Sequence, residues 1–238
     1  MNKDRLEAFS DGIFAIAITL LVLTIPQPNV RRFSNLTGQL LHRWPSFAAY
    51  AVSFAVIGIM WLNHQSIFSH LSAIDRRLTY LNFLLLLTVV FVPYPTGILG
   101  DALYQGKGTQ TAAVFYSLTM AMNALAWVGL WLHASTRRRL LADSFPEAYR
   151  RTATLLFSGG AIAYFVWVGV AFFSAYACLA LEGLMAVYYA FDPLSRYIAR
   201  RLAKGDPPDR VANAFDRDVV ELAAPNASSD LGPSDEPT

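Results

Sequence analysis

RLEAFSDG (residues 5–12) opens the first apolar segment of the chain and runs directly into IFAIAITLLVLTI (residues 13–25). Arg5, Ser10 and Asp11 therefore stand at the mouth of a segment long enough to cross a bilayer, which takes about 20 residues. Ionisable groups at membrane depth cost free energy, so they need partners or a function. We therefore expect this segment to carry information on both fold and function.

The composition indicates a membrane protein. The 238 residues are 55% hydrophobic and 15% charged, with a mean hydropathy of +0.37, whereas soluble domains carry about 25% charged residues. The charges before residue 8 are mixed in sign and the apolar run is too long for a signal peptide, so we expect a retained helix. The single Cys178 excludes an intrachain disulfide.

Six stretches are long and apolar enough to span a membrane, which predicts an all-α membrane protein with six transmembrane helices per subunit. They are residues 8–25, 45–63, 80–99, 112–133, 153–173 and 175–192. Pro93 and Pro95 are predicted to kink or end the third stretch. The last two stretches are nearly continuous, so a tight turn is expected near Ser174.

Charge and composition predict the orientation and the domains. With six spans, fifteen of the nineteen Lys and Arg residues fall on the side that holds both termini. The positive-inside rule therefore places both termini in the cytoplasm. Residues 1–203 form the predicted membrane domain. Residues 204–238 are rich in Asp, Pro, Ser, Ala and Asn, which predicts a largely disordered cytoplasmic tail.

The first segment has two predicted faces. At about 100° per residue, one face holds Gly12, Ile16, Thr19, Leu20 and Leu23. Asp11 lies about 140° from Ile16 and is expected to point into the subunit's own bundle. Such aliphatic triplets occur on most membrane helices, so ordinary contact with lipid or with neighbouring helices stays open as an alternative. The hydroxyl of Thr19 has the alternative of bonding the carbonyl of Ala15.

Polar residues also stand where the second stretch ends and the third begins. If these stretches form an antiparallel pair, His64 and Asn82 lie at the same membrane depth as Arg5 and Asp11. We predict that these four side chains satisfy one another, because a paired carboxylate stays charged where a lone one does not. For His64 alone, an interfacial histidine wetted by headgroup water is the alternative.

The pattern Arg-x-x-x-Phe-Ser-Asp, formed by Arg5, Phe9, Ser10 and Asp11, resembles the signature of the transmembrane protein 175 family. These proteins are potassium-permeable channels of bacteria, archaea and animal lysosomes. The likeness covers roughly residues 3–195. It extends to Trp61-Leu62-Asn63-His64, Asp75, Asn82 and the Leu-rich stretch that ends at Pro93.

The resemblance implies a homotetramer of the prokaryotic type in the plasma membrane, the inner membrane of a prokaryote, with helix one of each subunit lining the pore. Carried onto this sequence, Ile16, Leu20 and Leu23 form the pore constriction, or hydrophobic gate. Thr19 corresponds to the hydroxyl layer linked to potassium preference. The interhelical network comprises Arg5, Ser10, Asp11, Trp61, His64 and Asn82.

This family has no carbonyl selectivity filter, and the chain has no Thr-Val-Gly-Tyr-Gly sequence either. A ring of aliphatic side chains supplies no ligands and gates by dewetting. The expected function is therefore leak-like cation conduction with modest preference for K⁺.

The remaining residues offer rival functions. A proton-leak pathway or proton-coupled transporter would use Asp11, His64 and Glu182. Glu182 alone is otherwise a structural carboxyl, and Asp75 is expected to be a solvated loop charge. An intramembrane enzyme or binding protein and a membrane scaffold acting through the tail are weaker alternatives.

The sequence has no metal-ligand spacing, phosphate loop or nucleophile elbow. No enzymatic activity, cofactor or nucleic-acid partner is therefore predicted. The expected partners are the lipid bilayer, the permeant K⁺ and further copies of the chain.

Overall fold

The protein is seen in a computed structural model that describes residues 2–28, 35–137, 140–141 and 147–190. In these residues the chain is helical apart from its turns and one isolated backbone bridge between Leu71 and Leu141. The predicted tail, residues 204–238, lies outside the described residues. The helices are α1 (Lys3–Leu20), η1 (Leu21–Thr24), α2 (Leu36–His42), α3 (Trp44–Ser69), α4 (Arg76–Phe91), α5 (Pro93–Gln105), α6 (Thr109–Thr136), α7 (Glu147–Ala171) and α8 (Ala175–Ala190).

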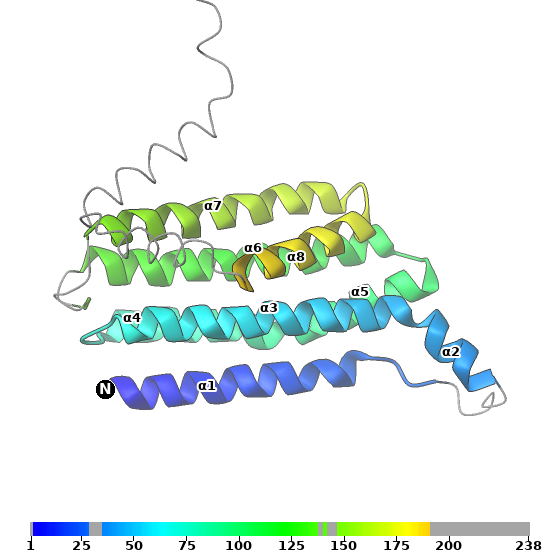
Figure 1. Ribbon diagram of the computed structural model, residues 1–238, viewed down its shortest axis with the longest axis horizontal. Coiled ribbons are helices and arrows are strands. Elements are labelled where there is room, and N and C mark those ends of the chain that lie inside the picture. Colours follow the sequence, from blue (N-terminus) through cyan, green and yellow to red (C-terminus); the bar gives the residue numbers. More distant parts are fainter. Residues whose placement is uncertain (1, 29–34, 138–139, 142–146, 191–238) are drawn as a thin grey trace, which may run out of the picture.

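The long helices lie side by side along one axis (Figure 1). Helix α1 lies at one edge, where it packs against α3 and α4. Helix α7 lies at the opposite edge and packs mainly against α6. We call the end at which α1 and α4 begin and α3 and α6 end the N-terminal end of the bundle; it is on the left in Figure 1.

Side-chain caps and proline determine where several helices begin and end. The Asn2 side chain accepts a hydrogen bond from the Asp4 amide, and the Asp75 side chain accepts one from the Leu78 amide. These bonds satisfy amide groups that have no partner inside their own helices. Pro93 starts α5 with only Val92 between it and the end of α4, which confirms the predicted interruption. A proline cannot donate the hydrogen bond that would continue the helix.

A described helix falls on each of the six predicted stretches, although some boundaries differ and residues 191 and 192 lie outside the described residues. Residues Lys3–Thr24, Trp44–Ser69, Arg76–Gln105 and Thr109–Thr136 are each long and apolar enough to cross a membrane. The apolar parts of α7 and α8 are shorter. Helix α3 runs six residues past the predicted end, so His64 lies inside a helix rather than at its tip. The short helix α2 has no counterpart among the predictions.

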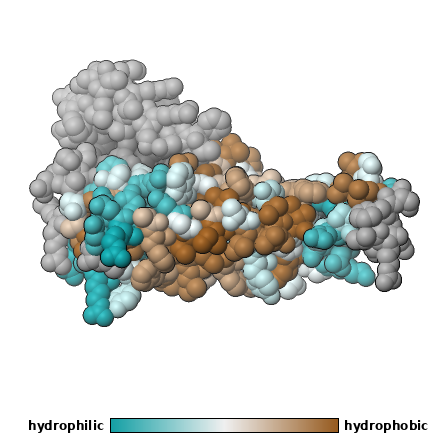
Figure 2. All heavy atoms as spheres, turned by 90° about the horizontal axis from the view of Figure 1, so that it is seen from below, coloured by the Kyte–Doolittle hydropathy of each residue, from teal (hydrophilic) through white to brown (hydrophobic). Residues whose placement is uncertain are grey.

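A continuous apolar core lies between the helices, and α1 contributes one stripe to it. The buried residues of α1 and η1 recur every three or four positions: Leu6, Ser10, Phe14, Ala17 and Leu21. This spacing places them on one side of a helix. Figure 2 shows a hydrophobic belt between two hydrophilic ends on the side of the molecule where α1 lies. Such a belt matches the hydrocarbon layer of a bilayer.

Candidate functional site

The aliphatic face predicted for helix one is the face that the subunit leaves uncovered. Ile16 is 51% exposed, Leu20 40% and Leu23 77%. Gly12 and Thr19 are exposed beside them. Leu23 belongs to η1 rather than α1, but this tighter turn keeps it on the outside. The fold therefore separates a core-facing stripe from an outward aliphatic face, which we call the open face of α1 and define by these five residues.

A buried hydrogen-bond chain ties α1 to α4 and α3. The Asn82 Nδ2 donates to Ser10 Oγ at 2.9 Å, and the His64 Nε2 lies 2.9 Å from Asn82 Oδ1. Ser10 in turn donates to the Leu6 carbonyl of its own helix. All three polar residues are completely buried. Because the Asn82 oxygen only accepts, the His64 Nε2 is the donor in this chain.

Aromatic rings enclose His64. Its imidazole stacks on Phe68 with ring centres 4.1 Å apart, and Phe14 of α1 lies 5.4 Å away. This environment differs from the wetted interfacial position weighed as its alternative. The extra turns of α3 beyond Asn63 bring Phe68 over the ring and exclude solvent. His64 therefore acts as a packed part of the polar chain.

A second polar contact fixes α1 on α3. The Trp61 Nε1 donates to Asp11 Oδ1 at 2.8 Å, and both residues are half-buried. Asp11 thus points toward its own bundle, away from the open face. Phe9, which is 52% exposed, makes an edge-to-face contact with Phe83 of α4. Together with the Ser10–Asn82–His64 chain, this bond holds α1 in one orientation.

Arg5 does not join this network. Its side chain is exposed and forms no hydrogen bond or ion pair with any residue that the structure describes. The reason is geometric, because Arg5 lies about 140° around the helix from Ser10 and sits in the first turn of α1. Lys3, two residues earlier, does reach the bundle, because its Nζ donates to the Leu71 carbonyl at 2.8 Å.

The Thr19 hydroxyl donates its hydrogen bond within α1. Its Oγ1 donates to the Ile16 carbonyl at 2.9 Å rather than to the carbonyl of Ala15. A hydroxyl that donates inward keeps its lone pairs as acceptors. The open face therefore carries one exposed side-chain acceptor among aliphatic groups.

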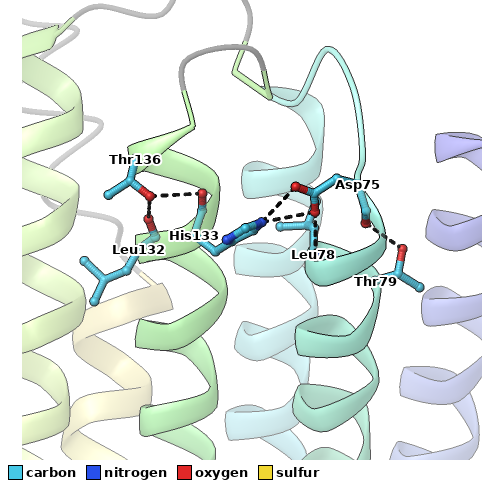
Figure 3. Close-up of polar contacts among 6 residues, drawn as sticks. All are labelled: Asp75, Leu78, Thr79, Leu132, His133 and Thr136. Atoms are coloured by element: carbon cyan, nitrogen blue, oxygen red, sulfur yellow. Dashed lines mark hydrogen bonds and ion pairs between the residues drawn. The ribbon is translucent and has the colours of Figure 1, made fainter.

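An ion pair that the sequence did not predict lies at the N-terminal end of the bundle, between His133 and Asp75 (Figure 3). The His133 Nε2 lies 3.0 Å from both carboxylate oxygens of Asp75. Asp75 also caps α4, and its backbone carbonyl accepts from the Thr79 hydroxyl. Asp75 is therefore no solvated loop charge. An aspartate directly before a helical pattern is a typical cap signal, but its partner on α6 is visible only in the fold.

Glu182 lies apart from these contacts. It is completely buried, and neither carboxyl oxygen has a hydrogen-bond partner among the described residues. Its own helix, α8, packs on α3, α6 and α7 rather than on α1. No hydrogen bond in the described ranges connects Asp11, His64 and Glu182, the three residues of the rival proton pathway. The same ranges contain no group of three His, Cys, Asp or Glu placed to hold a metal ion.

The comparisons with known proteins agree with this geometry. A family model described as endosomal/lysosomal potassium channel TMEM175 matches residues 5–93, which include the motif of α1 and the polar chain. A potassium channel of Streptomyces collinus is 45% identical over 193 residues, covering 81% of this chain and 94% of that protein. The human endosomal/lysosomal proton channel TMEM175 is 42% identical over 101 residues, covering 39% of this chain and 20% of that protein.

A solved structure supports the same relationship. The crystal structure of a lysosomal potassium-selective channel TMEM175 homolog from Chamaesiphon minutus is similar with a TM-score of 0.72 and 36% identity. The match covers 80% of this chain and 97% of that one. The chain thus covers 94% of the Streptomyces protein and 97% of the Chamaesiphon one, whereas it matches only 20% of the human protein. The chain therefore belongs to the TMEM175 family of potassium channels.

Proposed function

We propose that the protein is a leak-type, potassium-permeable cation channel in which α1 lines the ion path. Ile16, Leu20 and Leu23 form its constriction. One observation carries this proposal: the open face of α1 is apolar and uncovered, while polar bonds fix the opposite side of the helix to the bundle. Contact with lipid would also account for such a face. Membership of a channel family favours the other reading, in which the open faces of several subunits surround an ion path.

The proposed assembly is a homotetramer with four copies of α1 around a central axis. Six helices of each subunit cross the plasma membrane of a prokaryote. Lys3, Arg5, Arg76, Arg77 and Arg137 lie at the N-terminal end of the bundle. By the positive-inside rule that end faces the cytoplasm, so both termini are cytoplasmic. In this assembly the four copies of each constriction residue form a ring. The Ile16 ring then lies nearest the cytoplasm and the Leu23 ring nearest the outer side.

The chemistry of the open face sets the expected conduction. Aliphatic rings offer an ion no ligands, so the ion crosses only when water enters with it. Without carbonyls to replace the hydration shell, the path should differ little in its permeability to K⁺ and Na⁺. Four Thr19 hydroxyls supply the acceptors on this face, because each keeps its lone pairs free after bonding to Ile16. This layer accounts for the modest potassium preference that we propose.

Ion flux through the purified protein in vesicles, under separate K⁺ and Na⁺ gradients, tests the proposal. Ile16→Asn is expected to hydrate the constriction and raise flux about tenfold, equivalent to about 1.4 kcal/mol of barrier. The same variant should weaken the preference for K⁺. Thr19→Val keeps the shape of the side chain but removes the acceptor, so it should lower the K⁺ preference with little change in total flux.

The matched control is Ile162→Asn on α7, where the same residue type is 65% exposed. This control should leave flux and selectivity as in the wild type, because α7 lies at the edge of the bundle opposite α1. Equal flux from Ile16→Asn, Ile162→Asn and the wild type would show that α1 does not line the path. Absence of cation flux from folded wild-type protein would refute the channel itself.

A further inference from the structure

Glu182 is buried in the middle of α8 without a compensating charge. The titratable groups that interact electrostatically with its carboxyl are Tyr116 on α6 and Cys178 on α8. No Lys, Arg or His of the described residues is among them. On α3, which also packs against α8, the nearby polar residue is Ser53. An ionised carboxyl with no partner costs several kcal/mol in such a place, whereas a protonated one is neutral.

The neighbouring hydroxyls have a fixed direction of donation. Thr96 on α5 donates to the Val92 carbonyl at 2.8 Å, so the Ser53 hydroxyl, 2.8 Å from Thr96, is the donor of that pair. Each hydroxyl has one proton, so Tyr116, 3.0 Å from Ser53, donates to Ser53 in turn. This row of hydrogen bonds therefore begins at the Tyr116 hydroxyl. Its proton is already donated to Ser53, but its oxygen can still accept a hydrogen bond. A group arriving beside it must bring its own proton.

The other neighbour of the carboxyl supplies little to a negative charge. Ser117 and Cys178 bond to each other at 2.9 Å, which uses one of their two protons. Either atom can be the donor of this bond, and when the Ser117 hydroxyl donates to the sulfur only the thiol, a weak donor, is left. The site thus offers acceptors and a weak donor, a set that suits a carboxylic acid better than a carboxylate.

A cavity of about 70 Å³ lies beyond this site toward the N-terminal end of the bundle, and Glu182 is not among the residues that line it. It is lined by residues one or two helical turns beyond the site, including Val56 on α3, Ala124 on α6 and Ala186 on α8. Ala186 follows Glu182 by one turn on the same side of α8. Asn63 and Asn123 give the cavity polar walls, and the Asn123 Nδ2 donates to the Thr88 hydroxyl oxygen at 2.8 Å. The volume suits about two water molecules.

We propose that Glu182 is a proton-binding site inside the bundle, loaded by water that enters through the cavity at Asn63 and Asn123. The ligand is a proton delivered by water, and the site takes it up and releases it on the carboxyl oxygen. This site is separate from α1 and does not depend on the proposed ion path. It differs from a permanently protonated structural carboxyl, because the cavity lets the proton exchange.

Infrared difference spectroscopy of the full chain in vesicles, recorded between acidic and alkaline buffer, tests the site. The wild type should show a carboxylic acid C=O band that shifts in heavy water and disappears on alkalinisation. Glu182→Gln, which keeps the size of the side chain, should abolish this band. The matched control is Glu7→Gln in the first turns of α1, which should leave it in place. A band that survives Glu182→Gln, or that never responds to pH, would overturn the proposal.

A second variant keeps the test valid if Glu182→Gln does not fold. Asn63→Leu replaces a polar wall of the cavity and leaves Glu182 and its hydroxyl neighbours intact. The heavy-water shift of the C=O band should then develop about tenfold more slowly, which corresponds to about 1.4 kcal/mol of added barrier. Leu62→Asn, on the exposed side of α3, is the control and should not alter the rate. An unchanged rate in Asn63→Leu would show that the cavity does not supply the proton.

Discussion

Helices α1 and α6 are both long and apolar, yet the fold uses them in different ways. In the apolar stretch of α6, 61% of the residues are buried, against 28% in that of α1 and η1. Helix α6 packs on α4, α5, α7 and α8, whereas α1 packs chiefly on α3 and α4 at the edge of the bundle. Of these two apolar helices, the one at the edge of the bundle is thus much less covered.

The two helices also differ in what holds them. Apolar packing holds α6, with Tyr116 and Leu130 completely buried, and the His133–Asp75 pair fixes one end. By contrast, α1 presents one narrow buried stripe and depends on the Ser10–Asn82 and Trp61–Asp11 bonds for its orientation. Apolar composition therefore marks a membrane helix, but it does not say which face of the helix contacts lipid, another copy of the chain or an ion path.

The largest expected effect comes from truncating one leucine on each helix. Leu130→Ala on α6 opens a cavity at a completely buried position and should cost about 2–5 kcal/mol of stability. Leu23→Ala in η1, at a side chain that is 77% exposed, should change the stability of the subunit by less than about 0.5 kcal/mol. Thermal unfolding in detergent compares the two. Similar losses would mean that another copy of the chain buries Leu23 as completely as the bundle buries Leu130.

The next effect concerns the polar chain that orients α1. Asn82→Leu leaves the His64 Nε2 buried without its acceptor and Ser10 with only its bond to the Leu6 carbonyl, so it should cost about 1–3 kcal/mol. Ser10→Ala alone should cost less, because Asn82 keeps its bond to His64. Combining the two substitutions should cost less than their sum, since both remove the same bond. Strict additivity in the unfolding midpoints would show that the Ser10–Asn82 bond does not hold α1.

The smallest effect tests the end of α6. Asp75→Asn retains a side chain that caps α4 but loses the charge facing His133, so it should cost about 0.2–1 kcal/mol. Asp75→Ala loses the cap as well and should cost about 1–2 kcal/mol. Arg5→Gln, on the unpaired side of α1, is the comparison and should have no measurable effect. If both Asp75 variants unfold like the wild type, the ion pair contributes nothing to fixing α6.

Much of the architecture could be predicted because local rules govern it. The break at Pro93 and the turn near Ser174 follow from proline chemistry and hydropathy, and the helices bear them out. Four of the six apolar stretches coincide with helices long enough to cross a membrane, and α7 and α8 contain shorter apolar helices at the other two. Membership of the TMEM175 family, and with it a channel rather than an enzyme, could be predicted from the spacing of Arg5, Phe9, Ser10 and Asp11 and is confirmed by the relatives.

The partners of the polar residues could not be predicted from the same rules. From the sequence alone, Arg5 is expected to pair with Asp11, His64 and Asn82 because all four lie at one membrane depth. Depth does not say in which direction around the helix axis a side chain points. The structure instead pairs Asp11 with Trp61 and joins Ser10, Asn82 and His64. It also pairs Asp75 with His133, which are 58 residues apart.

By itself, the sequence determined that this protein is a bundle of membrane helices whose first helix has an aliphatic face from Gly12 to Leu23 opposite a polar one. Periodicity and hydropathy depend only on the residues within one helix, so the sequence of that helix is enough to reveal them. The tertiary structure alone shows that this aliphatic face stays open, that Glu182 is enclosed with no hydrogen-bond partner among the described residues, and that Arg5 lies outside the network they form. Burial and hydrogen bonding depend on which helices meet, and no pattern within a single helix specifies its neighbours.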